Sequence, residues 1–214
     1  DITYEKAFSS VTDADRAANY IHNSSQEFAE GVLDADKMII NQSEMDNFLI
    51  NNSTVAYSGC GAIALYNTIK TLDPESEVTF SQAVYWMEPY GVLNNAFGLL
   101  PMGVTNALNE LGYETQYCFS TDPTEISKAA AEADAAICLY ATSQNVHYVA
   151  YHADSVNDDG EQIFQFYNEK AEEHYDTYEA FDASLGRSVT DWVTGNGEGR
   201  VKLGALTILV NKSE

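Results

Sequence analysis

The chain has 214 residues, of which 45% are apolar, so it can form one domain with a substantial core, or one domain and a small appendage. It contains 33 acidic and 10 basic residues, a formal net charge of −23. Such a surface repels nucleic-acid phosphates and anionic membranes, so neither is expected as a partner. No apolar run approaches the roughly 18 residues of a membrane helix, so membrane insertion is not expected either. The oligomeric state stays open.

A helix is predicted near the start of the chain, over residues 12–31. Thr12 and Asp15 together form a helix-capping signal, and Gly31 is a suitable stop. Three apolar residues near one face of this helix are expected to pack inward: Ala17, Ile21 and Phe28. Residues 1–37 are therefore predicted to form an N-terminal helical extension to the main domain.

The rest of the first half alternates irregular segments with helices. Residues 32–58 are polar and rich in asparagine, with a short apolar island at 38–40, and 88–103 favours a packed loop. Helices are predicted at 60–72, at 80–87, at 105–111 and from Asp122-Pro123 onward. A strand near 115–119 lies between the last two.

The second half changes to β-branched and aromatic runs that are typical of strands. These runs are 136–141, 146–153, 162–167 and 203–210. The second and third flank Asn157-Asp158-Asp159-Gly160, which is a good hairpin turn. A helical half followed by an antiparallel half predicts an α+β domain over residues 38–214.

The three cysteines are Cys60, Cys118 and Cys138, too few and too far apart for a disulfide framework. They form no Cys-x-x-Cys pair and the four histidines are scattered, so no metal and no other cofactor is expected. Cys118 and Cys138 lie in apolar strand-like runs and are interpreted as small buried hydrophobic residues.

Cys60 lies in a different context, in the run Ser58-Gly59-Cys60-Gly61 at the start of a predicted helix. Unsatisfied N–H groups and the positive end of the helix dipole stabilise a thiolate at that position. The flanking glycines would let a substrate backbone come close. Cys60 is therefore the candidate nucleophile.

His147 is the candidate base. It lies in the strand that also contains His152, and because strand residues alternate between faces, only one of these two can face the helix of Cys60. His152 and Asp154 are interpreted as surface residues. An unpaired cysteine with a histidine far downstream is typical of thiol catalysis, and it favours His147 for this role.

A catalytic base needs a partner that fixes its tautomer and orientation. The hairpin returns Asn168 to the side of His147, and its side-chain carbonyl could accept from the imidazole. A strand-end cap is the alternative role for Asn168, with Asp154 and Asp176 as fallback orienting residues. For the oxyanion, the predicted donors are the Cys60 N–H and the Gln42 side chain. Asn51 and Asn52 are the alternatives to Gln42.

Together these residues resemble a known family. The run Ser-Gly-Cys-Gly-Ala-Ile-Ala-Leu, a Gln upstream, the strand His-Tyr-Val-Ala-Tyr and a polar end to the next strand are similar to papain-like peptidases that process bacteriocin leaders at double-glycine sites. The resemblance covers about residues 38–170, with Ala62 where many members have Pro and Asn168 where many have Asp. It implies a papain-like fold, the tetrad Gln42, Cys60, His147 and Asn168, and a bacterial protein outside the cell or at its surface, with any export leader absent from this sequence.

Three functions compete at this point. The first is a cysteine peptidase or amidase that forms an acyl-enzyme with a peptide or amide substrate. The second is a catalytically silent cell-surface binding module on the same fold. The third keeps the thiol chemistry but acts as a transglutaminase-like or peptidoglycan-cleaving enzyme. The acidic surface favours a cationic or neutral substrate in each case.

Overall fold

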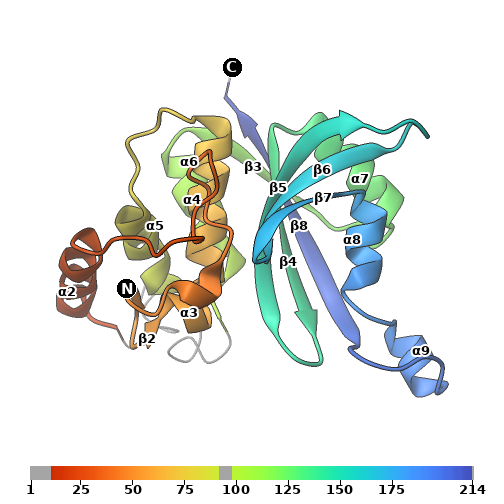
Figure 1. Cartoon of the computed structure of the whole chain (residues 1–214), viewed down its shortest axis with the longest axis horizontal. Coiled ribbons are helices and arrows are strands. Elements are labelled where there is room, and N and C mark those ends of the chain that lie inside the picture. Colours follow the sequence, from red (N-terminus) through yellow and green to blue (C-terminus); the bar gives the residue numbers. More distant parts are fainter. Residues whose placement is uncertain (1–10, 92–97, 214) are drawn as a thin grey trace, which may run out of the picture.

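The computed structural model describes residues 11–91 and 98–213, in which the helices of the first half cover one face of a sheet built by the second half (Figure 1). The elements of the first half are α2 (Asp13–Ser24), η1 (Gln42–Glu44), β1 (Leu49–Ile50), β2 (Ser53–Thr54), α3 (Val55–Ser58), α4 (Cys60–Leu72), α5 (Phe80–Met87), η2 (Glu88–Tyr90) and α6 (Pro101–Glu110). Those of the second half are β3 (Tyr113–Cys118), α7 (Pro123–Glu132), β4 (Ala135–Thr142), β5 (Val146–Val156), β6 (Gln162–Lys170), β7 (Glu172–Asp176), α8 (Tyr178–Ser184), α9 (Val189–Val193) and β8 (Lys202–Lys212).

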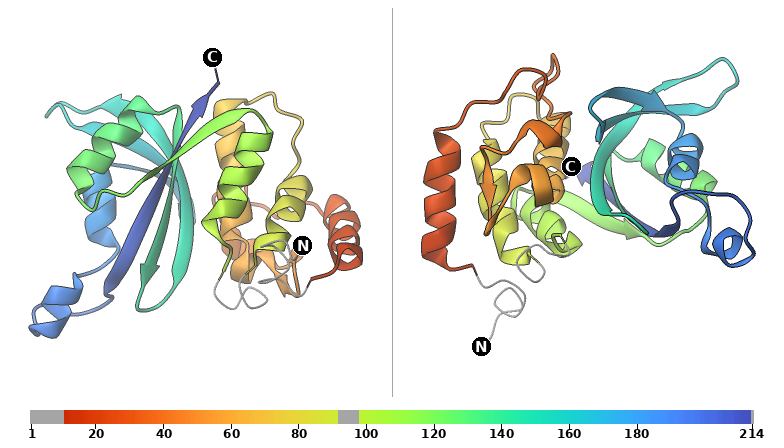
Figure 2. Two further views of the ribbon diagram at one scale, coloured as in Figure 1. Left: turned by 180° about the vertical axis from the view of Figure 1, so that it is seen from behind. Right: turned by 60° about the horizontal axis from the view of Figure 1, so that its bottom comes forward.

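The sheet has the strand order β3-β8-β4-β5-β6-β7, and every neighbouring pair is antiparallel. It is strongly curved, with α7 and α8 inside the curve and α4 against the other face (Figure 2). Each face therefore has its own buried apolar cluster, one shared with α4 and one shared with α7 and α8. The predicted α+β arrangement, with the helix of Cys60 packed on an antiparallel sheet, is confirmed.

Helix α4 is the central element of the first half, and most of its residues are buried. A helix that is apolar on nearly all sides needs partners all round, and α4 contacts α5, α6 and strands β4, β5 and β6. Its Asn67 is fully buried and binds both main-chain groups of Ile39, accepting from the N–H at 2.9 Å and donating to the C=O at 2.9 Å. This contact fastens the predicted apolar island at 38–40 to the helix of Cys60.

Helix α2 begins as predicted, with a capping box between Thr12 and Asp15. It ends at Ser24 rather than at Gly31, and the predicted apolar face is wrong, because the Ile21 side chain is 71% exposed. The buried residues are asparagines instead. Asn19 donates to Asn51 O and to the Glu88 carboxylate, while Asn23 bonds both main-chain groups of Leu49. Polar contacts, together with the edge-on contact of the Tyr20 and Tyr85 rings, thus attach this helix to the rest of the protein.

The other predicted elements are confirmed with small shifts. The helices at 60–72 and 80–87 have the predicted bounds, and the helix after Asp122-Pro123 is capped by the Asp122 side chain. Helix α6 begins at Pro101, four residues earlier than predicted, because proline fits the first helical position. Gly160, with φ +82°, forms the predicted hairpin turn. Within the predicted loop at 88–103, residues 92–97 lie outside the described residues.

In the described part of the chain, no helix is both long and apolar enough to cross a membrane. The same residues include no group of three or more His, Cys, Asp or Glu side chains that could bind a metal ion. The division into an extension at 1–37 and a domain at 38–214 stays a prediction.

Candidate active site

Cys60 is the first residue of α4, and its side chain is only 6% exposed. The two glycines beside it are required by packing. A Cβ on Gly59 would come within 2.8 Å of the Val55 main chain, and one on Gly61 would come within 2.9 Å of the Leu99 side chain. The structure thus adds a packing role for these glycines, and the approach of a substrate backbone stays a prediction. They let the start of the helix fit tightly around the thiol.

The His147 imidazole and the Cys60 thiol line the same cavity, and each shifts the pKa of the other. Burial by itself would raise the thiol pKa, but the interaction with His147 and the N–H groups of Tyr148 and Gly61 together hold the Cys60 pKa below its ordinary value. Burial by itself would lower the His147 pKa. The interaction with Cys60 and the hydrogen bond to the Asn168 carbonyl both raise it, and the net pKa lies above its ordinary value. Both shifts favour a thiolate beside an imidazolium.

The second ring nitrogen of His147 contacts a main-chain carbonyl. Its Nε2 lies 2.7 Å from Asn168 O, and because a carbonyl can only accept, Nε2 is the protonated nitrogen and Nδ1 is left for the thiol. Asn168 is the expected residue, but the contact uses its backbone rather than its side chain. Asn168 has φ +60°, and the β6–β7 register shifts next to it. This bulge turns the carbonyl toward the histidine.

The Asn168 side chain points instead to Gln42. The main-chain N–H of Gln42 donates to Asn168 Oδ1 at 3.0 Å, and Asn168 Nδ2 donates to Gln42 Oε1 at 3.0 Å. Gln42 Nε2 in turn donates to the carbonyls of Val55 and Ala56. These bonds turn the Gln42 amide toward the main chain before Cys60, and its oxyanion role stays a prediction. The pair joins the bulge of β6 to the segment before the nucleophile.

This geometry makes a prediction for Asn168→Gly. Glycine keeps the carbonyl and the positive φ but removes the bonds to Gln42, so alkylation of Cys60 by iodoacetamide should slow by less than about tenfold. The rate is measured on the native protein by peptide mapping. Asn168→Ala, which also keeps the carbonyl, is the matched variant. A loss in Asn168→Gly as large as that caused by removing His147 would show that the side chain is the orienting group.

The faces alternate along β5 as predicted, but the alternation assigns His147 to the face away from α4. Tyr148 and Ala150 belong to the cluster shared with α4, whereas Val149 belongs to the cluster on the opposite face, where the alternation would place His147 as well. His147 reaches Cys60 because it is the second residue of the strand, at the end of the sheet, where the cavity touches both faces. His152, expected at the surface, stacks on Tyr167 with ring centroids 5.7 Å apart.

A cavity of about 550 Å³ opens beside the thiol and the imidazole. The four predicted site residues, Gln42, Cys60, His147 and Asn168, all line it. The other residues that matter for its chemistry are Tyr57, Tyr140, Glu169, Lys170 and Arg200. None of these five was predicted from the sequence; Tyr140 lies in the predicted strand 136–141, and the structure makes it the cross-strand partner of His147.

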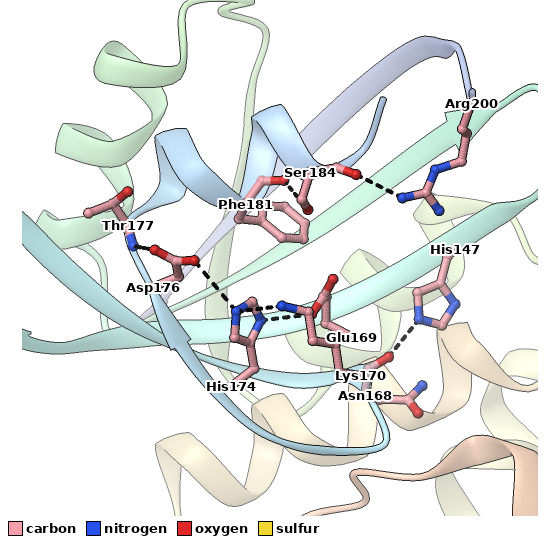
Figure 3. A network of polar contacts seen from close by, with 10 residues as sticks. All are labelled: His147, Asn168, Glu169, Lys170, His174, Asp176, Thr177, Phe181, Ser184 and Arg200. Carbon is pink, nitrogen blue, oxygen red and sulfur yellow. Dashed lines mark hydrogen bonds and ion pairs between the residues drawn. The ribbon is translucent and has the colours of Figure 1, made fainter. Parts of the chain in front are cut away.

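A second polar network continues from the bulge along β6 and β7 (Figure 3). The Glu169 carboxylate lies 2.7 Å from His174 Nδ1, and Asp176 lies 3.6 Å from His174 Nε2. Asp176, a predicted fallback orienting residue, therefore contacts His174, and no contact joins it or Asp154 to His147 among the described residues. Glu169 acts on the site through charge, since it helps to raise the His147 pKa.

Comparisons with known proteins give a weak likeness to solved structures and no family. No protein-family model matches the chain, and no curated protein matches it. Among solved structures, the chain is similar to the peptidase domain of Streptococcus ComA, a bifunctional ABC transporter of a quorum-sensing pathway, at 15% sequence identity and a TM-score of 0.45. The match covers 72% of this chain and 91% of that domain. At this level of likeness, a function must be inferred from the site itself.

Proposed function

We propose that this protein is a thiol-dependent hydrolase of papain-like type that cleaves a peptide or amide through an acyl-enzyme. The observation that supports this most is the position of the His147 imidazole, between the Cys60 thiol and the Asn168 main-chain carbonyl. A buried cysteine that only fills space needs no such partner, as Cys138 illustrates: burial raises the pKa of its thiol to about 12.

The proposed reaction has two steps. The Cys60 thiolate attacks the substrate carbonyl, and the imidazolium of His147 gives its Nδ1 proton to the leaving amine as the C–N bond breaks. Neutral His147 then takes a proton from water, whose oxygen attacks the thioester and releases the acid and the Cys60 thiolate. Throughout, the Nε2–H bond to Asn168 keeps the ring in one tautomer. The Cys60 main-chain N–H, at the first position of α4, is the proposed oxyanion donor.

Incubation with p-nitrophenyl acetate tests this function without knowledge of the natural substrate. We expect release of p-nitrophenol with an acetyl group found by mass spectrometry on Cys60, and loss of both in Cys60→Ala. Cys138→Ala, which removes the other buried thiol, is the matched control and should behave as the unsubstituted protein. Acetylation spread over all three cysteines, or none on Cys60, would contradict the proposal.

The fate of the acetyl group separates hydrolysis from acyl transfer. A hydrolase passes it to water, so added glycinamide should leave free acetate as the main product. Acetylglycinamide as the main product would indicate a transglutaminase-like enzyme. An inert Cys60 would instead favour a binding module.

A further inference from the structure

The cavity beside Cys60 has a local excess of positive charge on a strongly acidic chain. Besides the Cys60–His147 pair, its charged lining residues are Glu169, Lys170 and Arg200. Two of these three are basic, although the chain has 33 acidic and only 10 basic residues. The cavity therefore differs in charge from the surface around it.

The single carboxylate of the cavity already has partners. Glu169 is nearly buried, with its Oε2 atom 2.7 Å from His174 Nδ1 and 3.7 Å from Lys170 Nζ. Lys170 Nζ also lies 2.9 Å from His174 Nε2. Glu169 thus forms its ion pairs with His174 and Lys170 rather than with Arg200 (Figure 3).

Arg200 is held in place but has no acidic partner within the described ranges 11–91 and 98–213. Its Nη2 donates to Ser184 O at 2.8 Å, and its main-chain carbonyl accepts from Arg187 N at 3.0 Å. Gly186 allows this close approach, because a Cβ there would lie 2.4 Å from Arg200 O. The contacts leave the remaining guanidinium N–H groups for a ligand, and such a fork suits a carboxylate.

Tyr140, a further side chain of the cavity, fits the same ligand. The Tyr140 ring packs edge-on to the His147 ring, with centroids 5.8 Å apart, and Tyr140 lines the cavity. Burial raises the pKa of the Tyr140 phenol to about 12, so near neutral pH it is an uncharged donor that does not repel an anion. Charges on Glu169 and Arg200 also act on the Tyr140 phenol, the first raising its pKa and the second lowering it.

We propose that Arg200, with Lys170 nearby, forms a carboxylate-binding subsite, so that the substrate is a peptide or amide with a carboxylate close to the acyl group that Cys60 attacks. This inference rests on the proposed function and names its substrate class. It departs from the expectation that the acidic surface favours cationic or neutral substrates. Charge inside a cavity outweighs the average surface charge, because water and salt screen the distant acids.

The size of the cavity sets the expected effect. A compact space of 550 Å³ is about 10 Å across, close to the Debye length of roughly 10 Å at 0.1 M salt. A cation on its wall therefore lies within about one Debye length of an anion at Cys60, so salt weakens their attraction without abolishing it. Removal of one such cation should change the rate for an anionic reagent about threefold.

Paired alkylating reagents test this subsite. Iodoacetate is anionic and iodoacetamide is neutral, and both alkylate the same thiol. We expect the rate of Cys60 alkylation by iodoacetate, divided by the rate with iodoacetamide, to fall about threefold in Arg200→Gln. The same ratio should stay unchanged in Arg200→Lys. Arg200→Lys keeps the positive charge, so it separates the loss of charge from the loss of the bond to Ser184 O. Lys128→Gln, an exposed site on α7 outside the cavity, controls for net charge. At 1 M salt, the difference between the proteins should largely vanish.

The outcomes separate this inference from the proposed function. Selective reaction of Cys60 with iodoacetamide, together with an unchanged ratio in Arg200→Gln, would overturn the carboxylate subsite alone. No selective reaction with either reagent would overturn the proposed nucleophile and the subsite with it. A ratio that falls equally in Lys128→Gln would overturn the subsite by assigning the effect to net charge.

Protection from iodoacetamide identifies the source of the carboxylate. Protection of Cys60 by N-acetylaspartate amide would assign an acidic side chain, and protection by N-acetylglycine would assign a chain terminus. The neutral N-acetylasparagine amide is the matched control. Protection by neither acid would contradict the subsite.

Discussion

Replacing His147 by alanine is expected to slow alkylation of Cys60 by iodoacetamide at pH 6 by about 100-fold or more. Without the imidazole, burial dominates, and the thiol pKa should rise to its ordinary value of 9.0 or above. The thiolate fraction at pH 6 is then about one in a thousand or less. In the native protein the histidine keeps that pKa below 9.0, so much more of the thiol is ionised. The rates are measured by quenched labelling and peptide mapping.

His152→Ala is the matched control, since His152 lies on the same strand but stacks on Tyr167 rather than contacting the thiol. It should leave the labelling rate of Cys60 within about twofold of the native value. Equal rates in His147→Ala and the native protein would show that the imidazole does not activate Cys60.

The two pKa shifts also fix the direction of the pH dependence. Alkylation of Cys60 is lost as the pH falls through the lowered pKa of the thiol and persists at higher pH. Turnover has a second limit, because the leaving amine takes its proton from His147. Activity should therefore fall again as the pH rises through the raised pKa of His147. We therefore expect the turnover rate to depend on pH as a bell-shaped curve and the alkylation rate to show a single rise with pH.

Asn67→Ala should lower the free energy of unfolding by about 2–5 kcal/mol. Its fully buried side chain satisfies both main-chain groups of Ile39, and alanine leaves the N–H and the C=O without these partners. A cavity in the core adds to the loss. Urea denaturation followed by circular dichroism measures the change.

The control for this stability effect is Asn109→Ala. Asn109 is also a helical asparagine, but it is exposed and its bond to Thr115 lies at the surface. We expect a change within about 0.5 kcal/mol there. If Asn67→Ala behaved like Asn109→Ala, the segment at 38–40 would not depend on α4 for its position.

Local chemistry made the start of α4 and the strand of His147 predictable. A cysteine between two glycines before an apolar helical run, and a β-branched aromatic run around a histidine, are patterns within one segment. The structure brings these two segments together at one cavity. Helix α2 was harder to predict, because Asn19 and Asn23 attach it through hydrogen bonds that leave no apolar periodicity.

The roles of Asn168 and Gln42 depend on backbone geometry that a residue pattern does not encode. With a positive φ at Asn168, its main-chain carbonyl contacts His147 and its side chain contacts Gln42. The fold, rather than the local sequence, sets that angle. Arg200 had no sequence signal either, since it follows the run Gly197-Glu198-Gly199 and reaches the cavity through its contact with Ser184.

Iodoacetamide labelling of the native protein from pH 4 to 9, with peptide mapping, tests the central claim most directly. We predict that Cys60 reacts with an apparent pKa well below its ordinary 9.0, while Cys138, whose thiol pKa is about 12, stays unlabelled until the chain unfolds. Equal labelling of Cys60, Cys118 and Cys138, or a Cys60 that stays inert while the protein is folded, would contradict its role as a nucleophile activated by His147.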